Sequence, residues 1–337
     1  MKLDRNREKP LLIKLFPGII ISVAIIFVLT KIVDFEEALQ ELNNFSPWLI
    51  LVIFLLTVLS IVIRGLGWRS LLGNRISLKD SFFIIAEGYL LNNIIPRSGE
   101  IGRALILNGT NRIPFFHGIS TIMIERLLDL SIASIMFLST ISIAISYRWI
   151  ETIAYIVLLF VVGLIGIFIL YQRNRKYFDQ KLINISQKNK ILEKFILYPL
   201  RQIIDGLEVL NDFRMVVQSV LWIIFSWCIW LTMYYLMLNA IYTNPPFWWV
   251  LFSQSILALG IALPSAPASL GVYEGLNVAV LSVFGIQQEK ALSMALILHA
   301  IQIITNTSIG GVGLIIQKQS FSKLFKDLSR KEGETEK

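Results

Sequence analysis

Charged residues at helical spacing stand inside two apolar stretches of this 337-residue chain. In "PRSGEIGR", Glu100 and Arg103 are three residues apart, and in "IMIERLLDLSIAS", Glu125 and Asp129 are four apart with Arg126 between them. Such spacings place side chains on one face of a helix. Guanidinium groups bind phosphates and carboxylates, while carboxylates orient those cations or accept protons. The pattern therefore predicts a charge network that binds a phosphate-bearing group.

Unpaired charge is costly at membrane depth, so these residues either pair there or stay near water. For Glu125, Arg126 and Asp129, the alternative is a place at the cytoplasmic interface, with the side chains extended to water. For Glu100 and Arg103, the alternative is an exposed cytoplasmic loop without a ligand. The sequence leaves both alternatives open.

Residues that shape the backbone surround the first charged pair, in "NNIIPRSGEIGR". Proline ends a helix, and glycines permit close backbone approach or leave free amides at a new helix start, where anions bind. A lipid phosphate is the anion that a membrane supplies. The candidate site therefore also includes Asn92, Asn93, Pro96, Arg97 and Gly99.

A third constellation lies in "ALPSAPASLGVYEGLNVAVLSVFG". Pro264 and Pro267 interrupt any helix there, and Gly271 and Gly275 form a small-xxx-small pair suited to close helix packing. Glu274, a lone carboxylate, is expected to carry a proton or to meet an amino or ammonium group. A packing corner with this carboxylate at the outer interface is the alternative. The candidates here are Pro267, Gly271, Tyr273 and Glu274.

Two further polar patterns have structural interpretations. Arg64, Trp68 and Arg69 end the second apolar segment, where such residues anchor a helix at the interface or contact lipid headgroups. A polar stripe that begins at His299 in the last apolar segment is typical of interhelical hydrogen bonds.

The composition places these residues in a membrane protein. Hydrophobic residues make up 55% of the chain and charged residues 16%, with a mean hydropathy of +0.68, far from a soluble globular composition. The net charge of +8 then marks basic loops facing anionic lipid, and we expect no nucleic-acid partner. The single cysteine, Cys228, excludes an internal disulfide. Catalytic and nucleotide-binding motifs are absent, so we expect no cofactor and no metal.

A helical crossing needs about 20 apolar residues, which predicts an all-α, polytopic helical bundle. Two stretches, 81–112 and 264–286, are apolar but interrupted by Pro, Gly and charge. The predicted crossings are 12–33, 47–65, 117–146, 149–171, 215–241, 245–263 and 291–317.

Lys and Arg in the flanking loops set the orientation. Both ends of the chain are basic, whereas the "DFEEALQELNNFS" loop has four acids and no base, so both termini are expected in the cytoplasm. Keeping Arg97, Arg103 and Arg112 inside requires 81–112 to be a re-entrant hairpin entered from the cytoplasm. By the same count, residues 245 and 290 both lie outside, so 245–286 is either two crossings or a second broken pair entered from the opposite face. Opposed broken segments indicate an inverted repeat, although apolar segments also resemble one another by chance.

We expect a single membrane transport domain over residues 1–320. Within it, 172–214 is a basic cytoplasmic loop too short for a catalytic domain, with a surface-helix pattern in "ILEKFILYPL". Residues 321–337 have the composition of a disordered cytoplasmic tail.

The motifs, taken in order, resemble those of a known family. "GYLLNNIIPRSGEIGRALIL", "ERLLDL" and "LPSAPASLGVYEGLNVAVLSVFG" are similar to the membrane region of bacterial lysylphosphatidylglycerol synthases and to the wider flippase-like family related to it. The resemblance implies a helical bundle that moves a lipid, or a lipid-linked headgroup, between leaflets of the plasma membrane. The family often carries extra glycines where this chain has Ala266, Ala268 and Ser269.

Two-domain members of that family carry a soluble aminoacyl transfer domain after the membrane region. The present sequence ends at Lys337, so we expect a transporter without synthase activity. For this reason, the resemblance does not identify a lysyl-lipid as the substrate.

Three functions are open from the sequence. The first is a lipid flippase or headgroup transporter in which Arg103 and Arg126 bind phosphate while the acids orient them or contact a cationic headgroup. The second is an intramembrane transferase with Glu100, Glu125 or Asp129 as general base. The third is a non-transporting membrane partner of a separate lipid-modifying enzyme. The expected partners are a membrane lipid substrate and the bilayer itself.

Overall fold

Helices account for all regular secondary structure in the described residues of the computed structural model, which are 11–144, 212–260, 265–319 and six isolated positions between 152 and 166. The three continuous segments form ten α-helices, so the predicted all-α class is confirmed. These are α1 (Leu11–Ile32), α2 (Phe35–Glu41), α3 (Pro47–Leu71), α4 (Leu78–Ile94), α5 (Gly99–Asn111), α6 (Phe115–Ala144), α11 (Phe213–Ile241), α12 (Phe247–Gly260), α13 (Val272–Val283) and α14 (Gln288–Ile316). Two 3-10 helices, η1 (Leu42–Asn44) and η4 (Pro267–Ser269), complete them.

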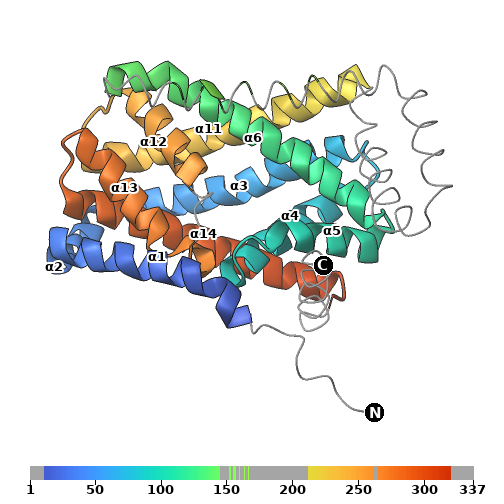
Figure 1. Ribbon diagram of the computed structural model, residues 1–337, viewed down its shortest axis with the longest axis horizontal. Coiled ribbons are helices and arrows are strands. Elements are labelled where there is room, and N and C mark those ends of the chain that lie inside the picture. Colours follow the sequence, from blue (N-terminus) through green and yellow to red (C-terminus); the bar gives the residue numbers. More distant parts are fainter. Residues whose placement is uncertain are drawn as a thin grey trace, which may run out of the picture.

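Three helices, α3, α11 and α14, are long and apolar enough to cross a membrane by length and composition. They coincide with the predicted crossings 47–65, 215–241 and 291–317. Together with α6, which covers the predicted 117–146 crossing, they run along the long axis of the molecule (Figure 1). This axis is therefore the natural direction of the membrane normal.

Other predicted segments lie wholly or largely outside the described residues. They are the crossing 149–171, the loop 172–214 and the tail 321–337.

α1 is followed by a sharp bend and a short helix where the sequence suggested a loop. α2 and η1 stand at 87° to α1. Asp34 at the break accepts hydrogen bonds from the backbone N–H groups of Glu36 and Glu37, at 2.9 and 3.1 Å, and so caps α2. Ala38 of α2 is buried at 1% exposure. The acidic segment thus closes one end of the bundle (Figure 1).

The interrupted 81–112 region forms an antiparallel helical hairpin of α4 and α5, here called the first hairpin. A Cβ on Gly88 would lie 3.2 Å from the carbonyl oxygen of Gly99, so glycine allows the helices to approach closely near the tip. At the open end, Asn111 Nδ2 donates to Asp80 Oδ2 at 3.3 Å. Both open ends of the hairpin therefore lie at the same end of the bundle, as predicted.

A second hairpin is formed by α12 and α13, with η4 in its tip. Near its open end, the rings of Trp249 and Phe284 stack with centroids 4.6 Å apart. The predicted small-residue pair packs against α1: a Cβ on Gly271 would lie 2.9 Å from Ile26 Cγ1. Residues 261–264 of the tip lie outside the described residues.

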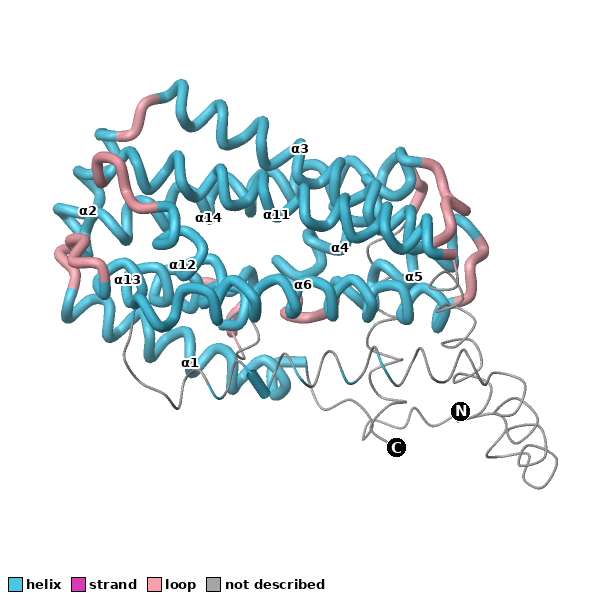
Figure 2. Tube along the Cα trace, turned by 90° about the horizontal axis from the view of Figure 1, so that it is seen from above, coloured by secondary structure: helices cyan, strands magenta, loops and turns pink. Residues whose placement is uncertain are grey.

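The two hairpins open at opposite ends of the bundle, and their tips lie against the middle of α14. Asn93 Nδ2 of the first hairpin donates to Thr307 Oγ1 at 3.1 Å. His299 Nε2 donates to the carbonyl oxygen of Ala268, in the second tip, at 2.8 Å. Figures 1 and 2 both show α4 and α5 at one end, and α12 and α13 at the other. The predicted opposition of the two regions is confirmed, while an internal repeat stays a prediction.

Close packing of α4 on α14 depends on glycine at position 310. A Cβ there would lie 2.6 Å from the carbonyl oxygen of Ala86 and 2.7 Å from Leu90 Cβ, whereas a Cβ on Gly311 would meet nothing within 4 Å. We expect Gly310→Ala to lower the free energy of unfolding by about 1–3 kcal/mol, the usual cost of overpacking. Gly311→Ala should leave it unchanged or raise it by up to about 1 kcal/mol, because alanine favours helix. Thermal unfolding of the purified variants in detergent measures both effects, and equal melting temperatures would contradict this packing.

Candidate functional site

Five charged side chains from three helices form one ion-pair network, here called the arginine cluster. Arg64 comes from α3, Arg103 from α5, and Glu125, Arg126 and Asp129 from α6. Glu125 Oε1 accepts from Arg64 Nε at 2.8 Å and from Arg126 Nη2 at 2.7 Å, and its Oε2 accepts from Arg103 Nη2 at 2.7 Å. Asp129 accepts from both terminal nitrogens of Arg64. One carboxylate is therefore shared by three guanidinium groups.

The arginine cluster is buried well inside the bundle. Glu125 is the eleventh residue of α6, which places it about 15 Å along the helix axis from the first residue. Its side chain is 0% exposed, and Arg103 is 3% exposed. The alternative in which these charges extend to interfacial water is therefore wrong for Glu125. Glu125 instead forms ion pairs with Arg64, Arg103 and Arg126.

Two tryptophans hold the arginine cluster in position. The Arg103 guanidinium carbon lies 4.3 Å from the ring centroid of Trp68, a cation–π contact, and Trp68 Nε1 donates to Thr121 Oγ1 at 3.1 Å. From α11, Trp227 Nε1 donates to Asp129 Oδ1 at 3.0 Å. Packing on four helices thus fixes the rotamers of the charged groups, which is what a specific anion site requires.

The arginine cluster carries a positive excess, because three arginines face two acids. Exposure is unequal: the side chain of Arg126 is 41% exposed, against 9% for Arg64 and 4% for Arg103. The longest ion pair of the network also belongs to Arg126, whose Nη2 lies 3.5 Å from Asp129 Oδ2. Arg126 is therefore the cation of the cluster that solvent reaches most easily.

Two residues of this region were not among the predicted site residues, and one predicted neighbour of Arg103 lies outside the ion-pair network. Arg64 and Trp68 were assigned to interfacial anchoring, but they are 8% and 0% exposed. The available signal was Gly65, where a Cβ would lie 3.4 Å from the Phe82 backbone nitrogen of α4: a small residue beside an arginine indicates enclosure by a neighbouring helix. Glu100, expected to join Arg103, is half-buried and has no ion pair within the described residues.

The remaining candidates of the first motif build the hairpin tip. Asn92 Oδ1 accepts from the Gly99 N–H at 2.7 Å, so that amide is already used and is not free for an anion. Asn93 joins the tip to α14, as described above. Pro96 follows the end of α4, and Arg97 is exposed with a left-handed backbone at φ 64°. These residues therefore shape the tip of the first hairpin.

The third motif forms a separate polar group under the second hairpin tip. His299 Nδ1 lies 2.6 Å from Glu274 Oε1, and Glu274 Oε2 accepts from the Gly271 N–H at 2.7 Å. Because His299 Nε2 donates its proton to the carbonyl of Ala268, the Nδ1–Glu274 contact holds one further shared proton. Glu274 and His299 are 5% and 6% exposed. The alternative of a carboxylate at the outer interface is wrong, and the predicted proton-carrying role stays a prediction.

The tip backbone explains why this motif favours small residues. Ala268 and Ser269 both have left-handed conformations, at φ 55° and 59°, which glycine adopts without strain. Pro267 begins η4, and the Tyr273 ring covers His299 with centroids 4.5 Å apart. The motif therefore builds a rigid turn closed by the Glu274–His299 pair.

Within the described residues, no group of three or more His, Cys, Asp or Glu side chains is placed to hold a metal ion.

Residues 16–310 match the protein family described as the lysylphosphatidylglycerol synthase TM region. The chain belongs to this family. It is a multi-pass membrane protein, and the resemblance of its three motifs is confirmed over most of the chain.

Two archaeal relatives are similar over nearly their whole length. A UPF0104 membrane protein of Methanocaldococcus jannaschii is 22% identical over 335 residues, covering 90% of this chain and 95% of the relative. A UPF0104 membrane protein of Methanothermobacter thermautotrophicus is 23% identical over 319 residues, covering 86% and 90%. No solved structure matches the chain.

The shared carboxylate of the arginine cluster is expected to be a main determinant of stability. Glu125→Gln removes the charge that three buried or partly buried arginines face, and breaking such a pair costs about 3–5 kcal/mol. Glu100→Gln changes the same residue type nearby without removing an ion pair, and should change stability by less than about 0.5 kcal/mol. Denaturation of both variants in detergent tests this expectation. A Glu125→Gln variant as stable as Glu100→Gln would show that the ion pairs do not form.

Replacement of Glu274 by glutamine is expected to destabilise the protein less than replacement by alanine. In Glu274→Gln, the amide oxygen can accept from Gly271 and the amide nitrogen can donate to His299 Nδ1, whereas Glu274→Ala loses both bonds. We expect the alanine variant to be less stable than the glutamine variant by about 1–3 kcal/mol, the cost of unsatisfied buried groups. Thermal melts of the two variants decide this, and the opposite order would refute the hydrogen-bond assignment.

Proposed function

We propose that the protein moves a phospholipid, or a lipid-linked polar headgroup, between the two leaflets of the plasma membrane. The observation that carries the proposal is the arginine cluster, with its positive excess inside the bundle. A phosphate group matches it, because guanidinium groups bind phosphate through paired hydrogen bonds. Lipid phosphates are the anions that reach such a depth attached to an apolar tail.

Arg126 is the proposed first contact of the phosphate. It is the most exposed arginine of the cluster, and its 3.5 Å pair with Asp129 is the easiest to replace. Glu125 and Asp129 orient the arginines when no lipid is bound, and keep the charges paired. A cationic headgroup would meet these same two acids.

The two opposed hairpins support a transport role over simple binding. Broken helices that meet near the middle of a spanning helix are the parts that alternate access in many transporters. Here both tips contact α14 close to its centre, through Thr307 and His299. Movement of either hairpin against α14 would open the region between them to one side of the membrane.

The orientation and partners follow from charge and chemistry. Arg75, Lys79 and Arg214 belong to the end of the bundle where the first hairpin opens, whereas Glu36 and Glu37 belong to the other end. By the excess of basic residues we place the former end, and both termini, in the cytoplasm. A separate lipid-modifying enzyme is the proposed source of the lipid headgroup.

A leaflet-exposure assay tests transport directly. Purified protein is reconstituted into liposomes with a fluorescent phosphatidylglycerol, and an impermeant reductant bleaches the outer leaflet. Arg126→Ala is expected to slow lipid movement at least about tenfold, which corresponds to about 1.4 kcal/mol, near the value of one charge-assisted hydrogen bond. Arg126→Lys should be intermediate, because lysine keeps the charge but not the planar fork.

Arg214→Ala is the matched control, since Arg214 is an exposed arginine at the start of α11. It should keep the wild-type rate. If lipid moves no faster in liposomes with the wild-type protein than in protein-free liposomes, transport is refuted. If Arg126→Ala moves lipid at the wild-type rate, the site is refuted. A changed lipid mass in the same vesicles would indicate a transferase.

A further inference from the structure

A second buried acid lies on the first hairpin, outside the arginine cluster. Glu87 of α4 is 0% exposed, and neither of its carboxylate oxygens has a hydrogen-bond partner within the described residues. It faces α14 at Gly313, where a Cβ would lie 2.8 Å from Glu87 Oε1. The glycine therefore makes room for this carboxyl group between the two helices.

The surrounding helices offer no cation to pair with Glu87. On α14, the facing positions Gly310 and Gly313 carry no side chain. On α5, Arg103 packs its stem against Gly88, but its terminal nitrogens are bonded to Glu125. The nearest charge on the same face of α4 is negative: Asp80, seven residues or about two turns earlier.

The other neighbours of α4 do not change this balance. On α3, Arg64 is bonded to Glu125 and Asp129, and Arg69 Nε donates to the carbonyl oxygen of Ile76 at 2.8 Å. Tyr89 is two residues along α4 and so projects to another face, while η4 has no charged residue. An ionised, unpaired carboxylate costs several kcal/mol in such surroundings. The packed arrangement of α4 on α14 thus requires Glu87 in its neutral, protonated form.

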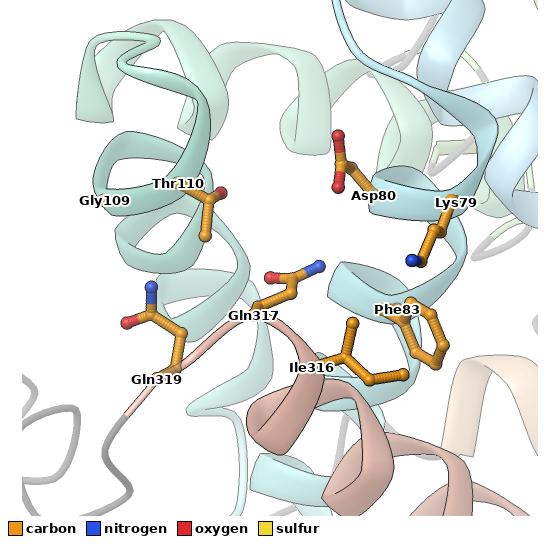
Figure 3. A pocket seen from close by; sticks show the side chains of 8 residues that line it. All are labelled: Lys79, Asp80, Phe83, Gly109, Thr110, Ile316, Gln317 and Gln319. Carbon is orange, nitrogen blue, oxygen red and sulfur yellow. The ribbon is translucent and has the colours of Figure 1, made fainter.

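A polar cavity lies at the end of the bundle beside the first turns of α4, the helix that carries this acid. The cavity has a volume of about 420 Å³ and lies where α4, α5 and α14 converge (Figure 3). Its lining includes Lys79, Asp80, Phe83 and Gln317, and the amide nitrogen and oxygen of Gln317 are buried without a partner in the described residues. Phe83 lines the cavity and also lies 3.1 Å from a Cβ built on Gly313. Phe83 therefore lies both at the cavity and beside the glycine that faces Glu87.

We propose that Glu87 is a proton-binding site that exchanges protons with solvent through this cavity, and that proton release loosens α4 from α14. The ionised carboxylate needs water, and water reaches it only when Phe83 and α14 move aside. Because Gly88 packs against the stem of Arg103, movement of α4 also moves the arginine cluster. This coupling between proton release and helix movement rests on the proposed function, and it makes a proton gradient the driving force of lipid movement.

Carbodiimide labelling tests the proton site without any transport assay. Dicyclohexylcarbodiimide is apolar and reacts with a protonated carboxyl group, whose O–H adds across one C=N bond; the O-acylisourea then rearranges to a stable N-acylurea carrying the whole reagent mass. In liposomes at neutral pH, the peptide that contains Glu87 should gain this mass. The peptide with Glu36 and Glu37 is the internal control, because both of its carboxyl groups are exposed to water.

Labelling at Glu87 should decrease as the pH is raised and be lost in Glu87→Gln, whose amide does not react. Glu87→Gln mimics the neutral acid, so its melting temperature should match or exceed that of the wild type at neutral and higher pH. An unlabelled Glu87 peptide, or a pH profile equal to that of the Glu36 peptide, would overturn the proposal.

An imposed pH gradient tests the coupling. With one proton moved per lipid, a gradient of about one pH unit shifts the steady-state leaflet ratio of the lipid by up to about tenfold. Glu87→Gln should lose this response, whereas Glu100→Gln, a carboxylate on the same hairpin, should keep it. Lipid movement that ignores the gradient in wild-type vesicles, or a response retained by Glu87→Gln, would overturn the coupling. If no lipid moves at all, the proposed function fails, and the labelling result still decides the proton site.

Discussion

Glu125 remains ionised at zero exposure only where guanidinium groups surround it, and this requirement positions much of the bundle. An unpaired carboxylate in apolar surroundings costs several kcal/mol. α6 can therefore bury Glu125 only when Arg64 of α3 and Arg103 of α5 pair with it. α5 can reach Glu125 only if the chain turns back at the tip after α4. The hairpin therefore follows from the ion pair as much as from Pro96.

Close backbone approach is the second requirement, and it depends on glycine. Gly88, Gly310 and Gly313 leave α4 near enough to both α5 and α14 for one helix to contact an ion-pair network on one side and a spanning helix on the other. In a membrane, such approach supplies packing energy that the hydrophobic effect does not provide between helices. The same glycines leave the space in which Glu87 is enclosed.

The sequence predicted the helical class and the first hairpin, because proline, glycine and positive charge interrupt otherwise apolar runs in a recognisable way. For 245–286 it left two alternatives, two crossings or a broken pair entered from the opposite face. It also grouped Arg103 with Glu125, Arg126 and Asp129, since helical spacing and the cost of charge restrict the choices. Arg64 and Glu100 were misjudged for one reason: which face of a helix is enclosed depends on neighbours far away in sequence. The pairing of Glu274 with His299 was equally hidden, because each residue alone has an ordinary structural explanation.

The surroundings of the two hairpins differ in how completely their polar groups are satisfied, and this difference indicates which hairpin moves. Around the second tip, Gly271, Glu274, His299 and Ala268 form a closed chain of hydrogen bonds, and the Ala266 N–H donates to Ser22 Oγ of α1 at 2.9 Å. Where α4 of the first hairpin packs on α14, the carboxylate oxygens of Glu87, within α4, and the amide of Gln317, just after α14, lack partners in the part of the chain that is described. A shift of an element whose polar groups are all hydrogen-bonded breaks those bonds and costs free energy. Polar groups without partners, by contrast, gain hydrogen bonds from any water that enters. Under the proposed transport cycle, the first hairpin is therefore the moving element, and the second hairpin, fixed to α1 and α14, is the frame against which it moves.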